Sequence, residues 1–586
     1  MKELLYLKPY LYKYRKSLIL GSLFILISNI FAVYIPQFVG QAFNEIEANL
    51  SKIAGNEEKI ADFTTSLLHY GAYVLLFALA KGFFMVLMRQ TVIVSSRKIE
   101  FDLKNTIFDH YQRLDQSFYL KNRTGDIINR ISEDVSKVRM FLGPAIMYSI
   151  NLSFMLILVV SKMYSVSPML TFYSLLPMPL LAVTIFFVSN RIHKLSLAVQ
   201  ESLARVSNIS QETFSGLRLV KSYVIEQVLN QQNDEASTDY KNQQLKLIKT
   251  QALFFPLMIL LIGSCSLIVV YFGGKEVING NMSQGTIAEF IIYINMLTWP
   301  VASIGWVSAL TYTAAASQKR INDFLKTETK IKNHPEAKVH SIAGDLVFDK
   351  VEFSYKTSGV HPIKNLSFRL EKGKTLGIIG KTGSGKSTIA QLLCRIDDID
   401  SGQILMNNLA INKHDLNDLR SSIAYVPQDV FLFSDTIKNN IAFGRIDASD
   451  EDVISAAKRA KIHDNIMQFK EGYESKIGER GISLSGGQKQ RISLARAMIK
   501  SPDLLILDDC LSAVDAETEH FIIQELKTWM KGKTSIVISH RISSLQHADQ
   551  IIVLDEGQII EQGTHESLIE NGNYYASVYK KQQLEA

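Results

Sequence analysis

The stretch that most limits what this chain can fold into runs from Gly380 to Ser387 and fits the pattern G-x-x-x-x-G-K-[ST] at every fixed position. The apolar run 375–379 before it has the character of a buried strand, and residues 388–393 after it have helical spacing. A strand, a glycine-rich turn and a helix form the arrangement in which backbone N–H groups and a helix N-terminus hold phosphate. The sequence therefore predicts an α/β nucleotide-binding domain around this loop. The residues expected to contact ATP here are Gly380, Lys381, Thr382, Gly383, Ser384, Gly385, Lys386, Ser387 and Thr388.

Particular side chains of this domain have predicted roles toward ATP and Mg²⁺. Lys386 is expected to reach the β- and γ-phosphates, and the Ser387 hydroxyl is expected to ligate Mg²⁺. The run Leu504–Asp508 describes a buried parallel strand that delivers the Asp508 carboxylate to the sheet edge beside the loop. Asp508 should hold the Mg²⁺ shell, mostly through water. ATP and Mg²⁺ are therefore the expected cofactors.

The first half of the chain has a different character. With 586 residues, of which 47% are hydrophobic, the chain is too long for one domain and too apolar for an ordinary soluble protein. Nearly uncharged runs recur, each long enough to cross a hydrocarbon core of roughly 30 Å. We therefore expect an α-helical polytopic membrane domain with six spans. The runs cover about 18–38, 67–88, 141–160, 170–188, 253–272 and 287–307.

The connections between these runs predict an orientation. Residues 91–140 and 189–250 are long, helix-patterned and rich in Lys and Arg beside the spans, which places them and both termini in the cytoplasm. Spans two to five should thus continue beyond the bilayer as helices. Segments 118–130 and 216–221 are then either turns between solvated helices or elbows that dock on a cytoplasmic partner. The expected location is a bacterial-type cell membrane, with the ATPase domain in the cytoplasm.

Composition sets the domain limits and excludes several classes. A polar linker over 326–342 separates a membrane domain over 1–325 from a soluble domain over 343–586. The three cysteines lie far apart, without disulfide or zinc spacing. A net charge of +6 does not indicate nucleic acid in a chain with many membrane-flanking Lys and Arg residues. The basic, aromatic N-terminus does not resemble a secretory signal peptide and favours an interfacial helix.

A second glycine-rich turn precedes an Arg-rich helical pattern. Glycines and a serine at a helix start form an anion-binding turn. A single ATP has no use for two phosphate cradles in one chain, so we expect this turn to serve a nucleotide held by another subunit. The turn consists of Leu484, Ser485, Gly486, Gly487 and Gln488.

These motifs, together with Gln428, Asp515 and His540, resemble the complete motif set of an ATP-binding cassette. With its six apolar runs, the whole chain resembles a bacterial half-transporter of the ABC exporter type. The resemblance implies two ATP molecules per dimer, each held between the phosphate loop of one subunit and the signature turn, 484–488, of the other.

The resemblance also implies roles for single residues. Tyr355 would stack on adenine, Gln428 would contact Mg²⁺ and the attacking water, and His540 would contact the γ-phosphate. Asp515 would belong to the D-loop between the two sites. Residues 479–481, just before the signature turn, would sense the elbows of the membrane domain.

One position departs from the family pattern. The family usually has Glu immediately after the Mg²⁺-binding Asp, because that carboxylate must reach the attacking water, whereas this chain has Asp509. The lost methylene shortens the reach by roughly 1.5 Å, and a misplacement of about 1 Å can cost on the order of a hundredfold in rate. The segment 507–515 resembles the degenerate subunit of heterodimeric multidrug-type exporters. We therefore expect a heterodimer with a second half-transporter subunit; the alternative is a homodimer with slow hydrolysis.

The expected function is ATP-driven export or flipping of a hydrophobic or amphipathic substrate of the drug or lipid class. The alternative is an ATP-gated channel or regulator, although the chain has no regulatory insert between its halves. An importer and a leader-cleaving peptide exporter are disfavoured. Substrate contact, packing and snorkelling remain open for Lys81, which interrupts the second span, as do a substrate cavity and helix packing for the aromatic and methionine residues of the last span. The latter are Tyr293, Met296, Trp299, Trp306 and Tyr312.

Overall fold

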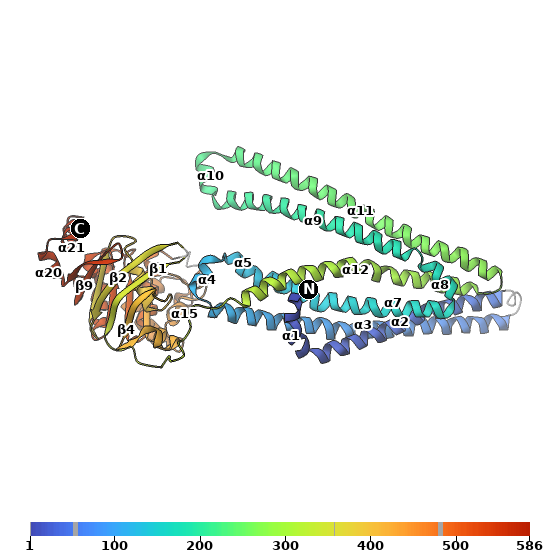
Figure 1. The fold of residues 1–586 in the computed structure, drawn as a ribbon, viewed down its shortest axis with the longest axis horizontal. Coiled ribbons are helices and arrows are strands. Elements are labelled where there is room, and N and C mark those ends of the chain that lie inside the picture. The colour runs from blue at the N-terminus through green and yellow to red at the C-terminus, as the bar shows by residue number, and fades with distance from the viewer. Residues whose placement is uncertain (1, 51–56, 357, 479–483, 586) are drawn as a thin grey trace. The chain divides into compact units, whose positions relative to one another are not determined.

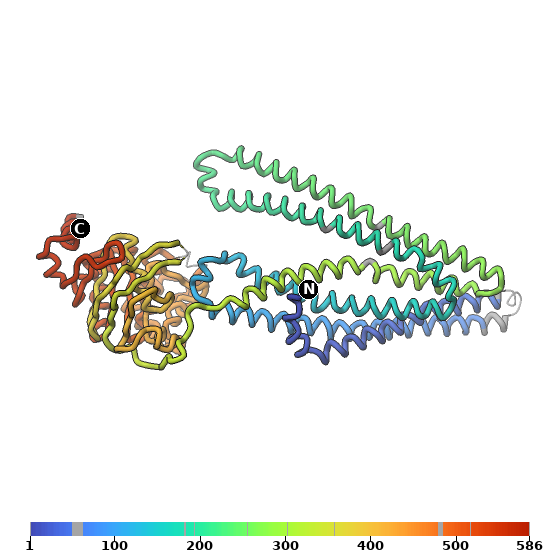
Figure 2. The backbone as a smooth tube through the Cα atoms, in the orientation of Figure 1, coloured from blue at the N-terminus to red at the C-terminus, as the bar shows by residue number. Residues whose placement is uncertain are grey.

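The computed structural model of the chain describes residues 2–50, 57–356, 358–478 and 484–585. The chain divides into two compact units, and Figure 2 allows the backbone to be followed through each of them. The first unit comprises Met1–Gln112 and Asn122–Thr327, and the second comprises Arg113–Lys121 and Glu328–Ala586. A short segment from the first half of the chain therefore belongs to the second unit.

The first unit consists of helices (Figure 1). Within the described residues, six helical segments are long and apolar enough to cross a membrane, which confirms the six-span prediction. The charged connections continue the spans as helices. The long helices are α2 (Arg15–Leu50), α3 (Glu57–Arg113), α7 (Ile146–Val166), α9 (Met178–Ser215), α11 (Glu226–Ile278) and α12 (Gln284–Leu325). The shorter elements are η1 (Lys2–Leu7), α1 (Lys8–Lys13), α5 (Thr124–Asn129), η2 (Arg130–Asp134), α6 (Val135–Met140), η3 (Phe141–Ala145), α8 (Pro168–Leu175) and α10 (Leu217–Tyr223).

Close helix contacts hold the first unit together. Helices α9 and α11 run side by side and are joined at one end by α10 (Figure 1). Helix α12 packs on α2, where Gly285 lies so close to the carbonyl oxygen of Gly40 that an added Cβ would collide with it. The Asn44 side chain accepts a hydrogen bond of 2.8 Å from the Gly285 N–H in the same contact. Small residues allow this approach of two apolar helices.

A buried polar pair lies in the same contact between α2 and α12. The hydroxyl of Tyr293 lies 2.9 Å from Oε1 of Glu289 and 3.1 Å from the carbonyl oxygen of Val33. Tyr293 is fully buried, and Glu289 is only 7% exposed. Because a carboxyl group in a membrane domain needs a polar partner, Tyr293 should stabilise this helix pair.

We expect Tyr293→Phe to lower the free energy of unfolding by about 1–3 kcal/mol, since it removes the hydroxyl partner of a buried carboxyl group. Thermal unfolding of the full chain in lipid nanodiscs measures the effect. Tyr271→Phe is the matched control, because Tyr271 is 65% exposed and should tolerate the change. If both variants unfolded at the wild-type temperature, the Tyr293 hydroxyl would not contribute to stability.

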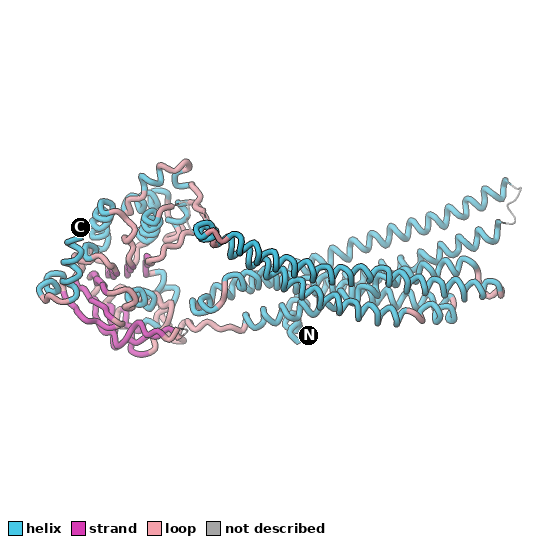
Figure 3. The backbone as a smooth tube through the Cα atoms, turned by 90° about the horizontal axis from the view of Figure 1, so that it is seen from above, coloured by secondary structure: helices cyan, strands magenta, loops and turns pink. Residues whose placement is uncertain are grey.

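The second unit contains two sheets, and Figure 3 shows strands in this unit. The six-stranded sheet has the order β10-β9-β3-β8-β7-β6, in which β9, β3, β8, β7 and β6 are parallel and β10 is an antiparallel edge strand. Its strands are β3 (Thr375–Gly380), β6 (Ile423–Val426), β7 (Leu504–Asp508), β8 (Thr534–Ile538), β9 (Gln550–Asp555) and β10 (Gln558–Gly563). The antiparallel sheet has the order β2-β1-β4-β5, with β1 (Leu346–Tyr355), β2 (Val360–Leu370), β4 (Ser401–Met406) and β5 (Leu409–Ala410).

Helices of this unit accompany the sheets and include α13 (Lys386–Leu393), α18 (Gly486–Met498) and α19 (Ala516–Met530). The others are α4 (Gln116–Lys121), η4 (Ile411–Lys413), α14 (Leu416–Ser421), α15 (Ile437–Ala442), α16 (Asp450–Arg459), α17 (His463–Met467), η5 (Gly472–Glu474), η7 (Ile542–Ser544), α20 (His565–Glu570) and α21 (Tyr574–Glu585).

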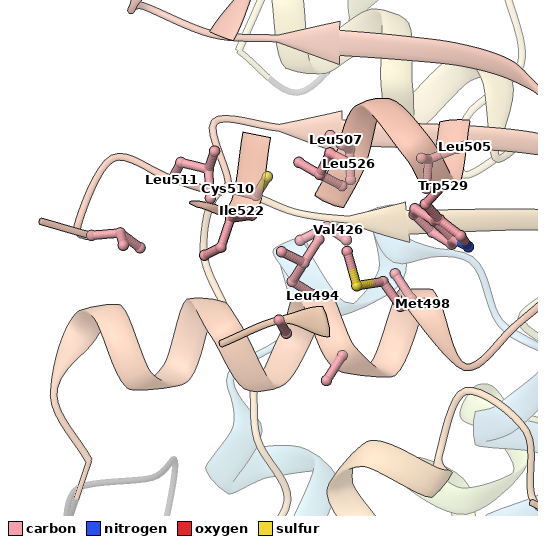
Figure 4. Packing of buried hydrophobic residues seen from close by; sticks show 14 of the residues in the cluster. Val426, Leu494, Met498, Leu505, Leu507, Cys510, Leu511, Ile522, Leu526 and Trp529 are labelled. Carbon is pink, nitrogen blue, oxygen red and sulfur yellow. The ribbon is translucent and has the colours of Figure 1, made fainter. Parts of the chain in front are cut away.

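Strand β7 shows why this sheet is buried on both faces. Its side chains alternate between two apolar clusters, because successive residues of a strand point to opposite faces. Leu505 and Leu507 belong to the cluster with Leu526 and Trp529 of α19 (Figure 4), whereas Leu504 and Ile506 belong to the cluster around Ile378 of β3. Both faces of the strand therefore need apolar side chains, which explains the continuous apolar run. The run ends at Asp508, the last residue of the strand.

The segment Arg113–Lys121 joins the second unit through the loop that follows α12. The Asp115 carboxylate accepts a hydrogen bond of 2.7 Å from the Lys330 N–H and another from the Ser117 hydroxyl. Phe118 and Tyr119 of α4 follow directly, with their rings edge to face. This segment lies in the long connection where the sequence left open a turn or an elbow.

Candidate active site at the strand ends

A cavity of about 300 Å³ lies at the carboxyl ends of the parallel strands. This is the edge where open α/β sheets bind ligands. Its walls bring together most of the residues singled out in the sequence. The two that lie farthest apart in the sequence, Tyr355 and His540, are separated by 185 positions. The predicted residues that line it are Tyr355, Thr382, Gly383, Gly385, Lys386, Ser387, Thr388, Gln428, Asp508, Asp509 and His540.

The other predicted loop residues, Gly380, Lys381 and Ser384, do not line this cavity. Gly380 ends β3 and lies against the carbonyl oxygen of Leu554, leaving no room for a Cβ. The Lys381 ammonium group lies 3.2 Å from the Asp555 carboxylate. Gly380 and Lys381 therefore anchor the loop to the sheet.

The backbone of the loop requires glycine at two positions. Gly383 and Gly385 have φ angles of 83° and 99°, a region that other residues rarely adopt. An added Cβ at Gly385 would also collide with the carbonyl oxygen of Pro362. The Lys386 ammonium group donates hydrogen bonds of 2.8 Å to the carbonyl oxygens of Gly380 and Lys381, which holds it over the turn. Burial lowers the pKa of Lys386, although the carboxylates of Asp508 and Asp509 oppose this effect.

Two adjacent carboxyl groups face the loop. Burial raises the pKa of Asp508, and the neighbouring Asp509 adds to this effect, whereas a hydrogen bond from Ser387 opposes it. The Asp509 N–H donates to the carbonyl oxygen of Ile538 at 2.8 Å, which ties this residue to β8. Asp509 has a φ of 47°, in the left-handed region that Asp and Asn tolerate better than most other residues. No local sequence pattern predicts this backbone conformation.

The raised pKa of Asp508 has a consequence for stability. A carboxyl group whose pKa is raised in the folded state stabilises the fold at low pH and loses this contribution as pH rises through the folded-state value. At neutral pH the buried charge is a cost, so Asp508→Asn should raise the unfolding temperature of the nucleotide-free protein by about 2–4 °C. The difference from wild type should shrink as pH falls. Calorimetry of the full chain at several pH values measures this.

Asp503→Asn, which alters a half-exposed carboxyl group just before the same strand, is the matched control and should leave the unfolding temperature unchanged. An unfolding temperature of Asp508→Asn at or below wild type at every pH would show that burial of this charge does not strain the fold.

The predicted signature turn does not line this cavity. The Ser485 hydroxyl accepts from the Gln488 N–H, and the Gln488 side chain accepts from the Ser485 N–H at 2.9 Å, so the turn begins α18 with a reciprocal cap. Gly487 lies close to the Ala513 carbonyl oxygen, 2.7 Å from where a Cβ would stand. The start of a helix carries free N–H groups of the kind that can bind an anion.

Gln490 connects this helix to the segment after β7. Its side chain donates to the Ser512 hydroxyl at 3.0 Å and accepts from the Ala513 N–H at 3.0 Å. Asp515, three residues after Ser512, accepts from the Thr518 N–H at 2.9 Å and caps α19. Sequence reasoning missed Gln490, because a glutamine in a polar helical pattern carries no signal of a long-range contact.

The remaining predicted residues lie as follows. The Tyr355 hydroxyl donates to Gln391 at 2.9 Å, beside the phosphate loop. His540 lines the cavity, and its carbonyl oxygen accepts from the Gln582 side chain at 2.7 Å. Next to His540, Arg541 forms an ion pair with the buried Glu519. Sequence reasoning also missed this ion pair. Residues 479–481, expected to sense the elbows, lie outside the described residues.

Comparison with known proteins identifies the family to which these motifs belong. Residues 18–301 match the family model described as the ABC transporter transmembrane region, and residues 363–512 match the model described as ABC transporter. The chain is 36% identical to the ABC transporter ATP-binding protein YknU of Bacillus subtilis, over 98% of this chain and 97% of that protein. The chain belongs to the ABC transporter family. It is also 33% identical to the multidrug resistance-like ATP-binding protein MdlA of Escherichia coli, over 89% of each chain.

A solved structure shares the fold of this ABC transporter. The structure of a bacterial Atm1-family ABC exporter with ATP bound matches with a TM-score of 0.78 at 24% identity and covers 98% of each chain. The predicted combination of a six-span membrane domain and an ATP-binding cassette is thereby confirmed. The protein is a multi-pass ABC exporter, an ATPase that couples hydrolysis to transport.

Cavities lined by residues of α12 occur in the described part of the membrane unit. One, of about 350 Å³, is lined by Tyr312 together with Phe186 and Asn190 of α9. The other, of about 430 Å³, is lined by Trp306 together with Arg89 of α3 and Tyr148 of α7.

The other candidates of the last span lie elsewhere. Tyr293 is fully buried, Met296 packs against the apolar cluster around it, and Trp299 is exposed. Lys81 is half-buried, and its carbonyl oxygen accepts from the Ser28 hydroxyl. Its side chain lines neither cavity.

Proposed function

We propose that this exporter moves a hydrophobic or amphipathic substrate of the drug or lipid class by alternating access, as one half of a heterodimer in which its own phosphate loop forms the slow site. The observation that carries this proposal is Asp509 in the nucleotide cavity, at the place where a longer carboxylate would act as the base. A site that holds ATP but cleaves it slowly suits a dimer in which the opposite site does most of the hydrolysis.

The residues of the cavity fit Mg²⁺ as well as nucleotide. The donor set combines the Asp508 carboxylate, the Ser387 hydroxyl and the Gln428 amide, all oxygen ligands of the kind that Mg²⁺ prefers. When bound, Mg²⁺ would neutralise charge that develops on the phosphates. Lys386 would orient the β- and γ-phosphates, and His540 would hold the γ-phosphate.

Two surfaces of the chain support the proposal of a dimer, because each of them needs a partner. Residues 484–488 lie outside the chain's own nucleotide cavity but form a capped, glycine-rich helix start suited to phosphate. The elbow around α10 exposes large apolar side chains that solvent does not favour. Phe214, Leu219, Tyr223 and Val224 are between 64% and 79% exposed. We propose that this elbow docks on the ATPase domain of the partner subunit and transmits its movement.

The charge pattern of the connections between the spans supports a proposed location and orientation. The proposed location is a bacterial cell membrane, with both termini and the ATPase domain in the cytoplasm, because the basic connections flank the spans on that side. The cavities at Tyr312 and Trp306 combine apolar and aromatic side chains with polar ones, which would suit an amphipathic ligand. The name of the relative MdlA, multidrug resistance-like, agrees with such a substrate.

Two linked measurements test this proposal. A tagged copy of the chain, purified from its native membranes, should bring down in equal amount a second ABC subunit that carries Glu after its Mg²⁺-binding Asp. The pair, in inside-out vesicles, should accumulate a fluorescent lipophilic dye against its gradient only while ATP is hydrolysed. A self-dimer would exclude the heterodimer, and dye movement that only dissipates a gradient would indicate a channel.

A further inference from the structure

A second cavity, of about 410 Å³, lies in the ATPase unit on the side of α19. Its size falls within the roughly 300–1,000 Å³ of small-molecule sites. It shares one wall residue, Ile538, with the nucleotide cavity, while Leu507 and Ser539 of its wall directly precede Asp508 and His540. An occupant would therefore touch the strand ends that carry the catalytic groups.

The inner wall of this cavity is apolar. Leu507, Cys510, Leu511 and Leu526 are all buried, and Figure 4 shows them within the apolar cluster of α19 and β7. The inner wall thus favours a hydrocarbon or aromatic body.

The rim of the same cavity is cationic. Lys374, Lys527 and Lys531 line it, against the single carboxylate of Asp549. That carboxylate is already engaged by the Lys374 ammonium group at 2.9 Å and the Thr375 N–H at 2.8 Å. Among the described residues, no carboxylate lies within ion-pair distance of Lys527 or Lys531. Two positive charges at the rim are therefore without an anion.

Two further polar side chains line this cavity. The Ser544 hydroxyl is buried, and among the described residues it has no hydrogen-bond partner. His547 also lines the rim, and burial lowers its pKa, an effect that Lys527 reinforces. The positive charges of Lys527 and Lys531 and the hydroxyl of Ser544 together favour the binding of one carboxylate group.

We propose that this cavity binds a small amphipathic monoanion, a carboxylate on an apolar chain, with its head group at Lys527 and Lys531 and its apolar body against Leu511 and Leu526. Such a ligand would regulate hydrolysis by fixing the strand ends before Asp508 and His540. This site is distinct from the nucleotide cavity and from the transport path.

Photo-cross-linking of the full-length chain in nanodiscs tests this proposal, with a decanoate analogue carrying a terminal diazirine as the probe. Mass spectrometry should locate cross-links on α19 or on residues 510–511, and excess decanoate should abolish them. The double variant Lys527→Gln/Lys531→Gln should lose about tenfold in labelling, since it removes the charge-assisted contacts to the head group. Lys470→Gln, at an exposed lysine outside the cavity, is the control.

Equal labelling by the uncharged decanol analogue would overturn the proposed preference for an anion, and absence of cross-links at these positions would overturn the site itself. Both comparisons use the wild-type chain, so they hold even if the double variant failed to fold. Labelling of the folded double variant at the wild-type level would also contradict the proposal.

Discussion

Replacing Asp509 by glutamate is expected to speed hydrolysis at the site of this chain's own phosphate loop by on the order of a hundredfold. Asp509 already faces the nucleotide cavity, so the variant adds the missing methylene without moving the carboxylate to another wall. The longer side chain would reach the attacking water as a general base. Single-turnover hydrolysis of bound ATP, with the partner's own catalytic Glu replaced by Gln, isolates this site.

Asp509→Asn is the matched control, because it keeps the size of the side chain and its compatibility with a φ of 47° but removes the base. If the aspartate is indeed a poor base, the Asn variant should differ little from wild type. A large loss of rate in Asp509→Asn, together with no gain in Asp509→Glu, would show that Asp509 is a competent base at its present length.

The signature turn should control the opposite site. We expect Gly487→Asp to lower the hydrolysis rate at the partner's phosphate loop by about 10²–10³-fold, the cost of removing preorganised donors from a developing charge. The new side chain would press against the Ala513 carbonyl oxygen and place a negative charge at a helix start meant for phosphate. ATP binding at this chain's own loop should persist, which equilibrium binding of a fluorescent ATP analogue measures.

Gly572→Asp is the control for that variant, because Gly572 has open space around it and a φ of 71° that aspartate tolerates. It should hydrolyse ATP like wild type. Loss of nucleotide from both sites in Gly487→Asp would contradict the assignment of this turn to the partner's site alone.

Much of the fold could be predicted because its signals are local. The strand, turn and helix around Lys386 lie within about twenty residues. The position of Asp508 after the apolar run marks the carboxyl end of that strand. The membrane spans can likewise be recognised from their length and lack of charge. For the same reason the residues that line the nucleotide cavity were identified from motifs, although they come from distant parts of the chain.

What could not be predicted depends on long-range contacts. Nothing near Gln490 indicates that its side chain holds the segment at Ser512 and Ala513, and nothing near Glu519 indicates its pairing with Arg541. Asp509 combines a left-handed backbone with a hydrogen bond to β8, and no local pattern encodes either feature. The attachment of Asp115 to the backbone at Lys330 joins residues 215 positions apart.

The most direct test of the central claim is a single-turnover measurement on the purified dimer in nanodiscs. The dimer is loaded with Mg²⁺ and γ-labelled ATP, chased with unlabelled ATP, and sampled for released phosphate and for label that stays bound as ATP. We expect two phases of equal amplitude, the slow one on the site that contains Asp509, and we expect Asp509→Glu to merge them. A single fast phase for all bound ATP in the wild-type dimer would contradict the assignment of a slow site to this chain.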